Sequence, residues 1–177
     1  MKRVLPVLLL VFMLSGVSFA DLGLKSVAPQ IGLVFPKSPF STGFEIGAIA
    51  NMGEFSPGFG LYPLITYWHA GGSEAGVDLS FSNFQIGGDV QYYFKEAPGL
   101  FAGAGLSLNF MSVSTEVTVP GFGSYTASGS DTKVGLGLLA GYEMPIDKYK
   151  GFAKAKYNLI SDTNTFELVI GLYFDIH

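Results

Sequence analysis

Large apolar residues occupy every second position near the end of the chain. Within 166–177, one set of alternate positions is large and apolar throughout: Phe166, Leu168, Ile170, Leu172, Phe174 and Ile176. The other set mixes charge, glycine and a tyrosine hydroxyl. A period of two predicts an extended strand, because successive side chains of a strand point to opposite faces.

Seven earlier segments repeat this asymmetry, with turn residues between them. We predict strands near 25–35, 43–53, 60–70, 83–94, 100–110, 133–144 and 153–159. Two of them contain a proline, which cannot donate a hydrogen bond to a strand ladder. We expect a bulge or a later strand start at Pro29, and Pro63 interrupts the third strand. Eight strands of about ten residues suit tilted membrane spans of roughly 9–11 residues.

The first twenty residues have a different pattern. Lys2 and Arg3 give a positive start, an apolar run covers 4–14, and small residues follow at 15–20. The apolar run is shorter than the roughly 20 residues of a membrane-spanning helix. We therefore predict a cleaved signal peptide over 1–20 and a single mature domain over 21–177.

Composition adds a contrast between hydropathy and segment length. Mean hydropathy is +0.40 and 14% of residues are charged, as in membrane proteins. No apolar run after residue 20 reaches the length of a spanning helix, and only helices and closed barrels satisfy every backbone hydrogen bond in lipid. The predicted fold class is therefore all-β, an eight-stranded antiparallel up-and-down transmembrane β-barrel behind a signal peptide.

Charge after residue 20 is acidic. Eight lysines and no arginine stand against fourteen acids, which gives a net charge of −6. Binding to nucleic acid needs basic residues that neutralise phosphates, so we expect no nucleic-acid partner. The chain contains no cysteine, so no disulfide can form.

The polar face of the strands is predicted to point inward. The apolar face carries no lysine or arginine, and such a residue near the middle of a membrane costs roughly 2–4 kcal/mol. An eight-stranded interior has room only for side chains. Glycines on the polar face would relieve crowding there: Gly47, Gly87, Gly103, Gly105, Gly135, Gly137, Gly141 and Gly171. The alternative is a soluble barrel with an apolar interior.

Enclosed charges need partners. We hypothesise a salt-bridge network that fills the lumen, formed by inward-facing Glu45, Asp89, Glu143, Lys154, Lys156 and Glu167. Lys133 falls on the same face. The alternative for Lys133 and Glu143 is that they lie at the barrel mouths, in contact with water.

The longest connection covers 112–131. Its segments 114–119 and 124–127 predict two extended arms about a turn at 120–123, as if two strands continued beyond the membrane. The segment 71–76 is predicted as another long loop, and 54–58 as a short turn. Bacterial barrels place short turns in the periplasm, so both termini would be periplasmic. An exposed strand edge on the 112–131 hairpin would offer a protein partner a pairing site.

These strands, with glycine-rich repeats such as 103–106 and 135–142, resemble the outer-membrane protein β-barrel domain family, small barrels of the OmpX, OmpW and OmpA type. The resemblance implies a multi-pass protein of the bacterial outer membrane, surrounded by outer-membrane lipids and lipopolysaccharide and inserted by the barrel assembly machinery. Gly171, Phe174 and Ile176 match the spacing of the family's C-terminal assembly signal, although His177 follows.

Some barrels of this kind modify lipid A with serine, histidine and an acid. His69, Ser73 and Glu74 are the one candidate cluster, but the predicted glycine loop gives them no fixed mutual geometry. No loop has the ligand spacing of a calcium or zinc site. We therefore predict no catalytic residue, cofactor or metal.

Four aromatic residues are predicted at the membrane interfaces: Tyr67, Trp68, Tyr92 and Tyr142. The resulting functional expectation is a non-enzymatic barrel with a structural, envelope-integrity or surface-interaction role. A small pore for ions or small apolar solutes is the alternative, and lipid A modification comes third.

Overall fold

A computed structural model describes residues 22–74, 77–119 and 123–176. The predicted signal peptide lies outside these residues. The described residues form nine strands: β1 (Ser26–Pro36), β2 (Gly43–Asn51), β3 (Glu54–Ser56), β4 (Phe59–Glu74), β5 (Val77–Tyr93), β6 (Leu100–Val119), β7 (Gly123–Ile146), β8 (Tyr149–Ile160) and β9 (Thr165–Asp175).

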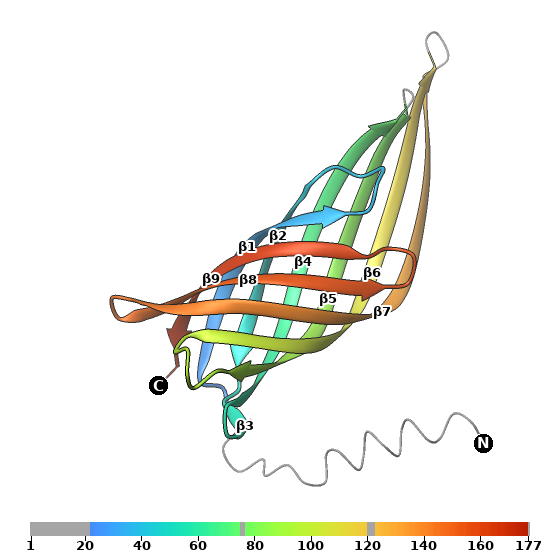
Figure 1. Cartoon of the computed structure of the whole chain (residues 1–177). Coiled ribbons are helices and arrows are strands. Elements are labelled where there is room, and N and C mark those ends of the chain that lie inside the picture. Colours follow the sequence, from blue (N-terminus) through green and yellow to red (C-terminus); the bar gives the residue numbers. More distant parts are fainter. Residues whose placement is uncertain (1–21, 75–76, 120–122, 177) are drawn as a thin grey trace, which may run out of the picture.

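Eight of the strands close into a barrel (Figure 1). Consecutive long strands pair antiparallel, β9 pairs with β1, and pairing of β2 with β4 completes the ring. The short β3 adds to the start of β4. The predicted all-β, eight-stranded antiparallel architecture is confirmed.

In the part of the chain that the structure describes, no helix has the length and apolar character needed to cross a membrane.

Three local predictions were wrong. Pro29 causes neither a bulge nor a late start, because β1 keeps one register with β9 from Ser26 to Pro36 while pairing skips 28 and 29. The exposed Pro29 ring points outward. The expected loop at 71–76 is strand up to Glu74, which pairs with Val77. The expected turn at 54–58 contains β3.

Two hairpins extend well past the rest of the barrel at one end (Figure 1). The β6–β7 ladder continues without a register shift to the pair Val119 and Gly123, which confirms the predicted hairpin. The β4–β5 ladder likewise reaches Glu74 and Val77. We call this the hairpin end, and the opposite end, with the short β5–β6 and β7–β8 connections, the turn end.

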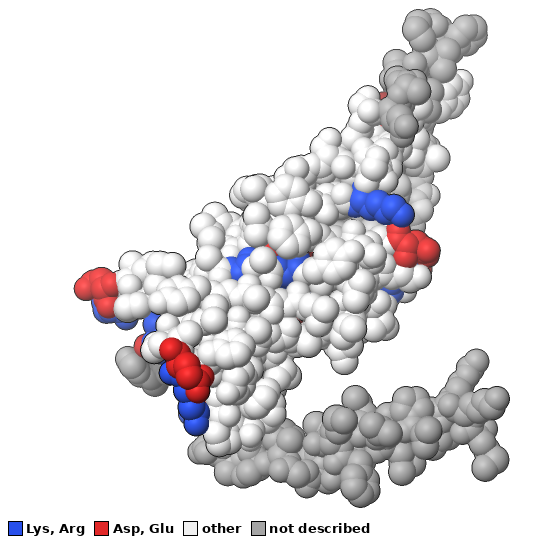
Figure 2. Space-filling model, in the orientation of Figure 1, with Lys and Arg blue, Asp and Glu red and all other residues white. Residues whose placement is uncertain are grey.

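The outside of the barrel is an apolar band between two rings of aromatic residues. Large apolar side chains, such as Leu106 at 57% exposure, point outward from the long strands. Charged side chains in Figure 2 gather mainly toward the ends of the visible face. The ring near the hairpin end contains Phe35, Phe44, Tyr67, Phe84, Phe110, Tyr157 and Phe166. The ring at the turn end contains Phe59, Tyr92, Phe94, Tyr142, Tyr149 and Phe174.

The distance between the rings suits a membrane. From Phe84 to Tyr92 on β5, eight residues rise about 27 Å along the strand. With the 35–45° tilt typical of such barrels, this corresponds to roughly 20 Å across the membrane, near the apolar band of about 25 Å in outer-membrane barrels.

Candidate functional site: a filled interior and a projecting sheet

The middle of the barrel holds a layer of buried polar side chains. Charged groups and amides from seven strands meet there, each at most 4% exposed: Gln30, Glu45, Thr66, Asn83, Gln85, Asp89, Gln91, Asn109, Lys154, Lys156, Asn158 and Glu167. They reach the interior because they occupy the polar set of alternating positions in their strands.

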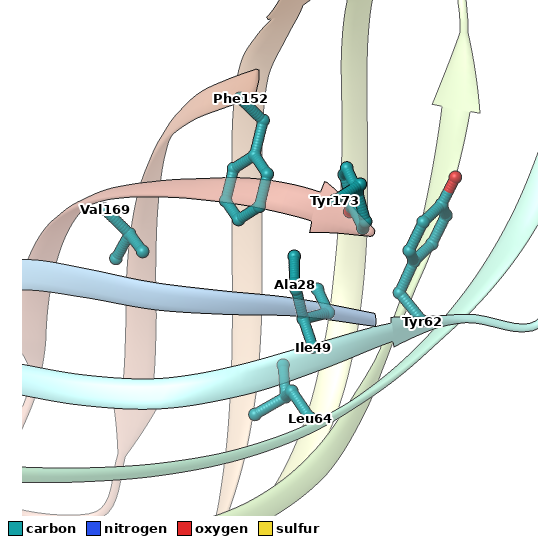
Figure 3. Close-up of a cluster of buried hydrophobic side chains, with 7 residues drawn as sticks. All are labelled: Ala28, Ile49, Tyr62, Leu64, Phe152, Val169 and Tyr173. Atoms are coloured by element: carbon teal, nitrogen blue, oxygen red, sulfur yellow. The ribbon is translucent and has the colours of Figure 1, made fainter. Parts of the chain in front are cut away.

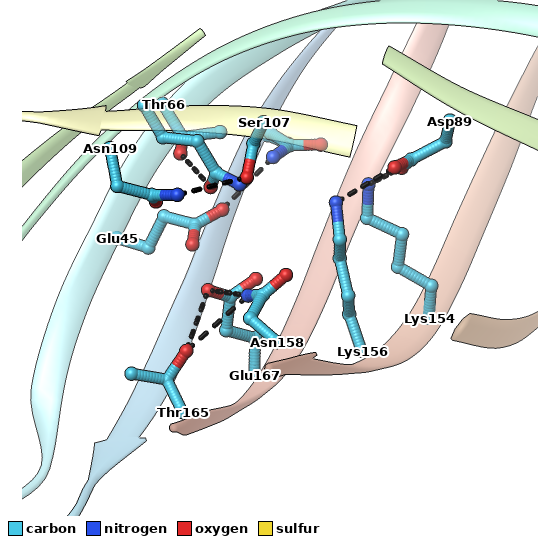
Figure 4. A network of polar contacts seen from close by, with 12 residues as sticks. Glu45, Thr66, Asp89, Ser107, Asn109, Lys154, Lys156, Asn158, Thr165 and Glu167 are labelled. Atoms are coloured by element: carbon cyan, nitrogen blue, oxygen red, sulfur yellow. Dashed lines mark hydrogen bonds and ion pairs between the residues drawn. The ribbon is translucent and has the colours of Figure 1, made fainter. Parts of the chain in front are cut away.

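Asp89 is the centre of the charge in this layer. Its carboxylate accepts a hydrogen bond from Lys156 Nζ at 2.8 Å and lies 3.8 Å from Lys154 Nζ. Figure 4 shows both lysine side chains, from alternate positions of β8, reaching toward Asp89 on β5. One buried carboxylate therefore pairs with two buried ammonium groups from the opposite side of the barrel.

The other two carboxylates of the layer are held by amides. Gln30 Nε2 donates to Glu45 at 2.9 Å, and Asn158 Nδ2 donates to Glu167. Glu167 also accepts from the Thr165 hydroxyl at 3.4 Å. The structure thus brings Asp89, Lys154 and Lys156 into direct ion pairs, and places Glu45 and Glu167 in the same layer with amide donors.

Two predicted members of the network lie elsewhere. Glu143 is at the turn end and accepts a hydrogen bond from the Tyr93 hydroxyl. Lys133 is at the hairpin end, 3.6 Å from Asp131 and 3.4 Å from Asp162. Both are only partly buried, as expected for residues at the mouths of the barrel.

Interior glycines make room for the central charges. A Cβ placed on Gly105 would overlap Oδ1 of Asp89 and lie 2.9 Å from the Gly88 carbonyl oxygen. A Cβ on Gly137 would lie 2.5 Å from Cε of Lys156. These positions therefore need glycine because another strand's side chain occupies the space.

Gly105→Ala should lower the free energy of unfolding by about 1–3 kcal/mol, the usual cost of overpacking. The new methyl group would push Asp89 away from its lysines. The measurement is the urea concentration at the midpoint of unfolding. The folded form is detected by its faster migration in unboiled gels. Gly129→Ala on β7 is the control, since no atom lies within 4 Å of its added Cβ. Equal effects of the two changes would contradict this account.

An apolar cluster closes the polar layer on the turn side (Figure 3). It consists of Ala28, Ile49, Tyr62, Leu64, Phe152, Val169 and Tyr173. The Phe152 and Tyr173 rings are 5.1 Å apart between centroids, and Tyr62 lies 6.5 Å from Tyr173. Tyr93 packs against the cluster and its hydroxyl is 3.0 Å from that of Tyr62.

A second apolar cluster closes the hairpin side. It consists of Val34, Trp68, Ala70, Phe81, Met111 and Ile160. Trp68 is 1% exposed and its ring lies 4.9 Å from Phe81. The prediction that Trp68 sits at a membrane interface was therefore wrong, whereas Tyr67 on the other face of β4 does point outward at 44% exposure. The barrel interior therefore holds buried apolar side chains on both sides of the polar layer.

The sequence did contain a signal for these clusters. Phe81, Phe152 and Tyr173 are aromatic residues on the polar set of alternating positions, near strand ends. Large rings at such positions indicate an apolar plug above or below the polar layer.

The projecting hairpins form a curved sheet of β4, β5, β6 and β7 with a free edge on each side. On β7, pairing with β8 begins at Gly135, so 123–134 pair only with β6. On β4, pairing with β2 stops at His69. The backbone groups on the outer side of 123–134 have no strand beside them among the described residues.

The candidate triad is not assembled. His69 and Ser73 both lie in β4, where the sequence suggested a loop. Four residues of strand separate them by about 13 Å, far beyond the hydrogen-bond distance that a nucleophile and its base need. Both side chains are exposed.

The predicted assembly signal lies on and just after β9. Gly171 is inside the barrel, where a Cβ would lie 2.5 Å from the Phe152 ring. Phe174 and Ile176 point outward, at 42% and 48% exposure. Phe174 packs 5.0 Å from Tyr149 in the aromatic ring of the turn end.

Comparison with known proteins gives structural matches. No protein-family model matches the sequence, and no curated protein matches it either. Among solved structures, Neisserial surface protein A aligns with a TM-score of 0.57 and 19% identity over 85% of this chain and 96% of its own. The attachment invasion locus protein Ail of Yersinia pestis gives 0.57 and 13%, over 87% and 99%.

A third solved structure also matches most of the chain. A major outer membrane protein of Thermus thermophilus gives a TM-score of 0.59 and 13% identity, over 87% of this chain and 100% of its own. At these identities the likeness concerns the fold. The chain has the fold of the small outer-membrane β-barrels, as its sequence pattern predicted.

Proposed function

We propose that this chain is a non-enzymatic integral protein of the bacterial outer membrane that interacts with other proteins at the cell surface through its projecting sheet. The observation that carries the proposal is the free edge of β7 over 123–134, on a barrel with two buried apolar clusters inside it. The apolar outer band and its two aromatic rings support the membrane location.

The proposed orientation places the turn end and both termini in the periplasm. Short connections at 94–99 and 147–148 lie at that end, and the long hairpins lie at the other. Lipopolysaccharide would then surround the half of the barrel nearest the hairpins. Gly171, Phe174 and Ile176 are proposed to be read by the barrel assembly machinery during insertion.

The packing of the interior argues against a pore. Two apolar clusters, which contain Trp68, Phe81, Phe152 and Tyr173, lie above and below the central ion pairs. Steady ion flow would need both clusters to open and the charges around Asp89 to separate. The distance between His69 and Ser73 equally disfavours lipid modification.

A surface-interaction role follows from what unpaired strands do. An exposed edge presents a row of backbone donors and acceptors that can pair with a strand of another chain. One structurally similar protein, Ail of Yersinia pestis, is described as an attachment invasion locus protein. That description concerns the Yersinia pestis protein, and it is consistent with an attachment role for a projecting sheet on this fold.

Replacing 113–129 with Asn-Gly should abolish adhesion and leave the barrel folded. The change joins Ser112 to its register partner Ser130 through a two-residue turn that suits a β-hairpin. It removes the projecting edge but keeps the outward apolar band. The measurement is retention, on a protein-coated surface, of cells that display either chain, relative to cells that display neither.

Two controls accompany this experiment. Heat-modifiable gel migration and membrane fractionation should be unchanged, which shows that the shortened barrel folds and inserts. Both purified proteins should be silent in planar bilayers. Undiminished adhesion of the shortened chain would refute the surface role, and steady single-channel steps from the intact chain would favour the pore.

A further inference from the structure

The two faces of the sheet exchange their polarity where the hairpins leave the barrel. Within the barrel the outward positions of β5, β6 and β7 are apolar, whereas beyond the aromatic ring they carry hydroxyl and carboxylate groups: Asp78, Ser80, Ser82, Ser112, Ser114, Glu116, Thr126, Ser128 and Ser130. The inward positions change the other way and become mainly apolar: Val77, Leu79, Phe81, Val113, Tyr125 and Ala127.

This apolar inner face is only partly covered. Ala127 is exposed, Tyr125 is 65% exposed, and nothing lies within 4 Å of a Cβ placed on Gly129. A cavity of about 330 Å³ opens at its foot, next to the free edge of β7, and so falls at the lower end of the range of roughly 300–1,000 Å³ for ligand sites. Its lining combines Phe81, Met111 and Val113 with Gly129, Ser130, Asp131, Lys133 and Thr163.

On the opposite side, the chain already covers the same face with one of its own loops. Phe40, from the connection between β1 and β2, lies with its ring 5.1 Å from that of Phe81. The next residue, Ser41, donates its backbone N–H to the carbonyl oxygen of Gly71 at 2.8 Å, on the part of β4 that β2 does not pair. An aromatic anchor and a backbone hydrogen bond to the free edge thus hold the β1–β2 loop there.

We infer that the β7 side binds an extended segment of a second polypeptide in the same way. The segment pairs with the backbone of 123–134 and places an aromatic or large aliphatic side chain in the cavity beside Gly129. Strand pairing fixes the partner's pattern, because its alternate side chains fall on the two faces of the sheet. Those on the inner face are apolar and those on the outer face are polar. This inference rests on the proposed surface role and specifies its partner.

Other occupants fit less well. The hairpins lie beyond the aromatic ring that contains Phe84 and Phe110, and their outer face is polar, so membrane lipid does not reach them. A second copy in the same membrane is related to the first by rotation about the membrane normal. The two β7 strands would then run in the same direction through the membrane with tilts of about 35–45° that cross, and could not pair antiparallel.

The test uses a fluorescent peptide with the sequence 112–119, in which Phe replaces Val113. In the protein, this segment pairs with β7, with position 113 opposite Gly129, and its sequence has valine at 113, 117 and 119. Polarisation titrations measure its binding to the folded barrel in micelles. Ala127→Asp puts a charge on the inner face and should weaken binding at least about tenfold, because an unpaired charge in an apolar contact is costly.

The matched control moves the same charge by one residue. Ser128 is also exposed and lies on the outer face of the same strand, so Ser128→Asp should change binding less than about twofold because strand neighbours point to opposite faces. Equal weakening by both variants, wild-type affinity for Ala127→Asp, or no saturable binding to the wild type would each overturn the inference. If only the Asn-Gly replacement abolishes adhesion and Ala127→Asp does not, the surface role stands and the aromatic site falls.

Discussion

Asp89→Leu should destabilise the barrel by about 3–5 kcal/mol, the cost of leaving a buried ion without its partner. Asp89 is fully buried and is the carboxylate within 4 Å of the two buried ammonium groups of Lys154 and Lys156. Without it, two positive charges remain in an interior that apolar clusters separate from water at both ends. The urea midpoint of the folded form measures the change.

Variants of the lysines separate charge from shape. Lys156→Met should cost less than Asp89→Leu, because Lys154 remains 3.8 Å from the carboxylate. Combining Asp89→Leu with Lys154→Met and Lys156→Met removes the three ions that pair directly, while Glu45 and Glu167 keep the amide donors Gln30 and Asn158. Such a replacement of a whole buried ion cluster is often neutral or stabilising, so the triple variant should recover most of the lost stability. A triple variant as unstable as Asp89→Leu alone would show that Asp89 acts through packing.

The period of two carried most of the fold prediction. It placed Glu45, Asp89, Lys154, Lys156 and Glu167 on the inner face because side-chain direction in a strand depends only on position along it. It also predicted the two extended arms of the 112–131 hairpin, which are joined locally. Both results need no knowledge of how distant strands meet.

The alternation could not predict which side chains meet across the barrel. Asp89 and Lys156 are 67 residues apart in sequence, and their meeting depends on the stagger of strands around the ring. The same limit explains Trp68, which sits in a strand with aromatic residues on both faces. An apolar plug inside the barrel and lipid outside both favour a tryptophan, so hydrophobicity alone cannot tell which of the two Trp68 faces.

Leu106→Lys should lower the free energy of unfolding in a bilayer by about 2–4 kcal/mol, the cost of a lysine near the middle of the membrane on the lipid face. Leu106 is an outward residue of β6, 57% exposed, and lies between the two aromatic rings. The measurement is urea unfolding of the barrel in lipid vesicles.

The control for this prediction comes from the same strand. Ser114 also points outward from β6, but it lies past Phe110 and the aromatic ring, so Ser114→Lys should change stability by less than about 0.5 kcal/mol. With Leu106 pointing outward, as in this structure, a barrel surrounded by water would not show this difference between the two variants. If the exposed leucines faced water, lysine at 106 would be tolerated as well as lysine at 114. A large penalty at 106 alone therefore requires that the apolar band faces lipid, the condition on which the orientation of the projecting sheet toward the cell surface depends.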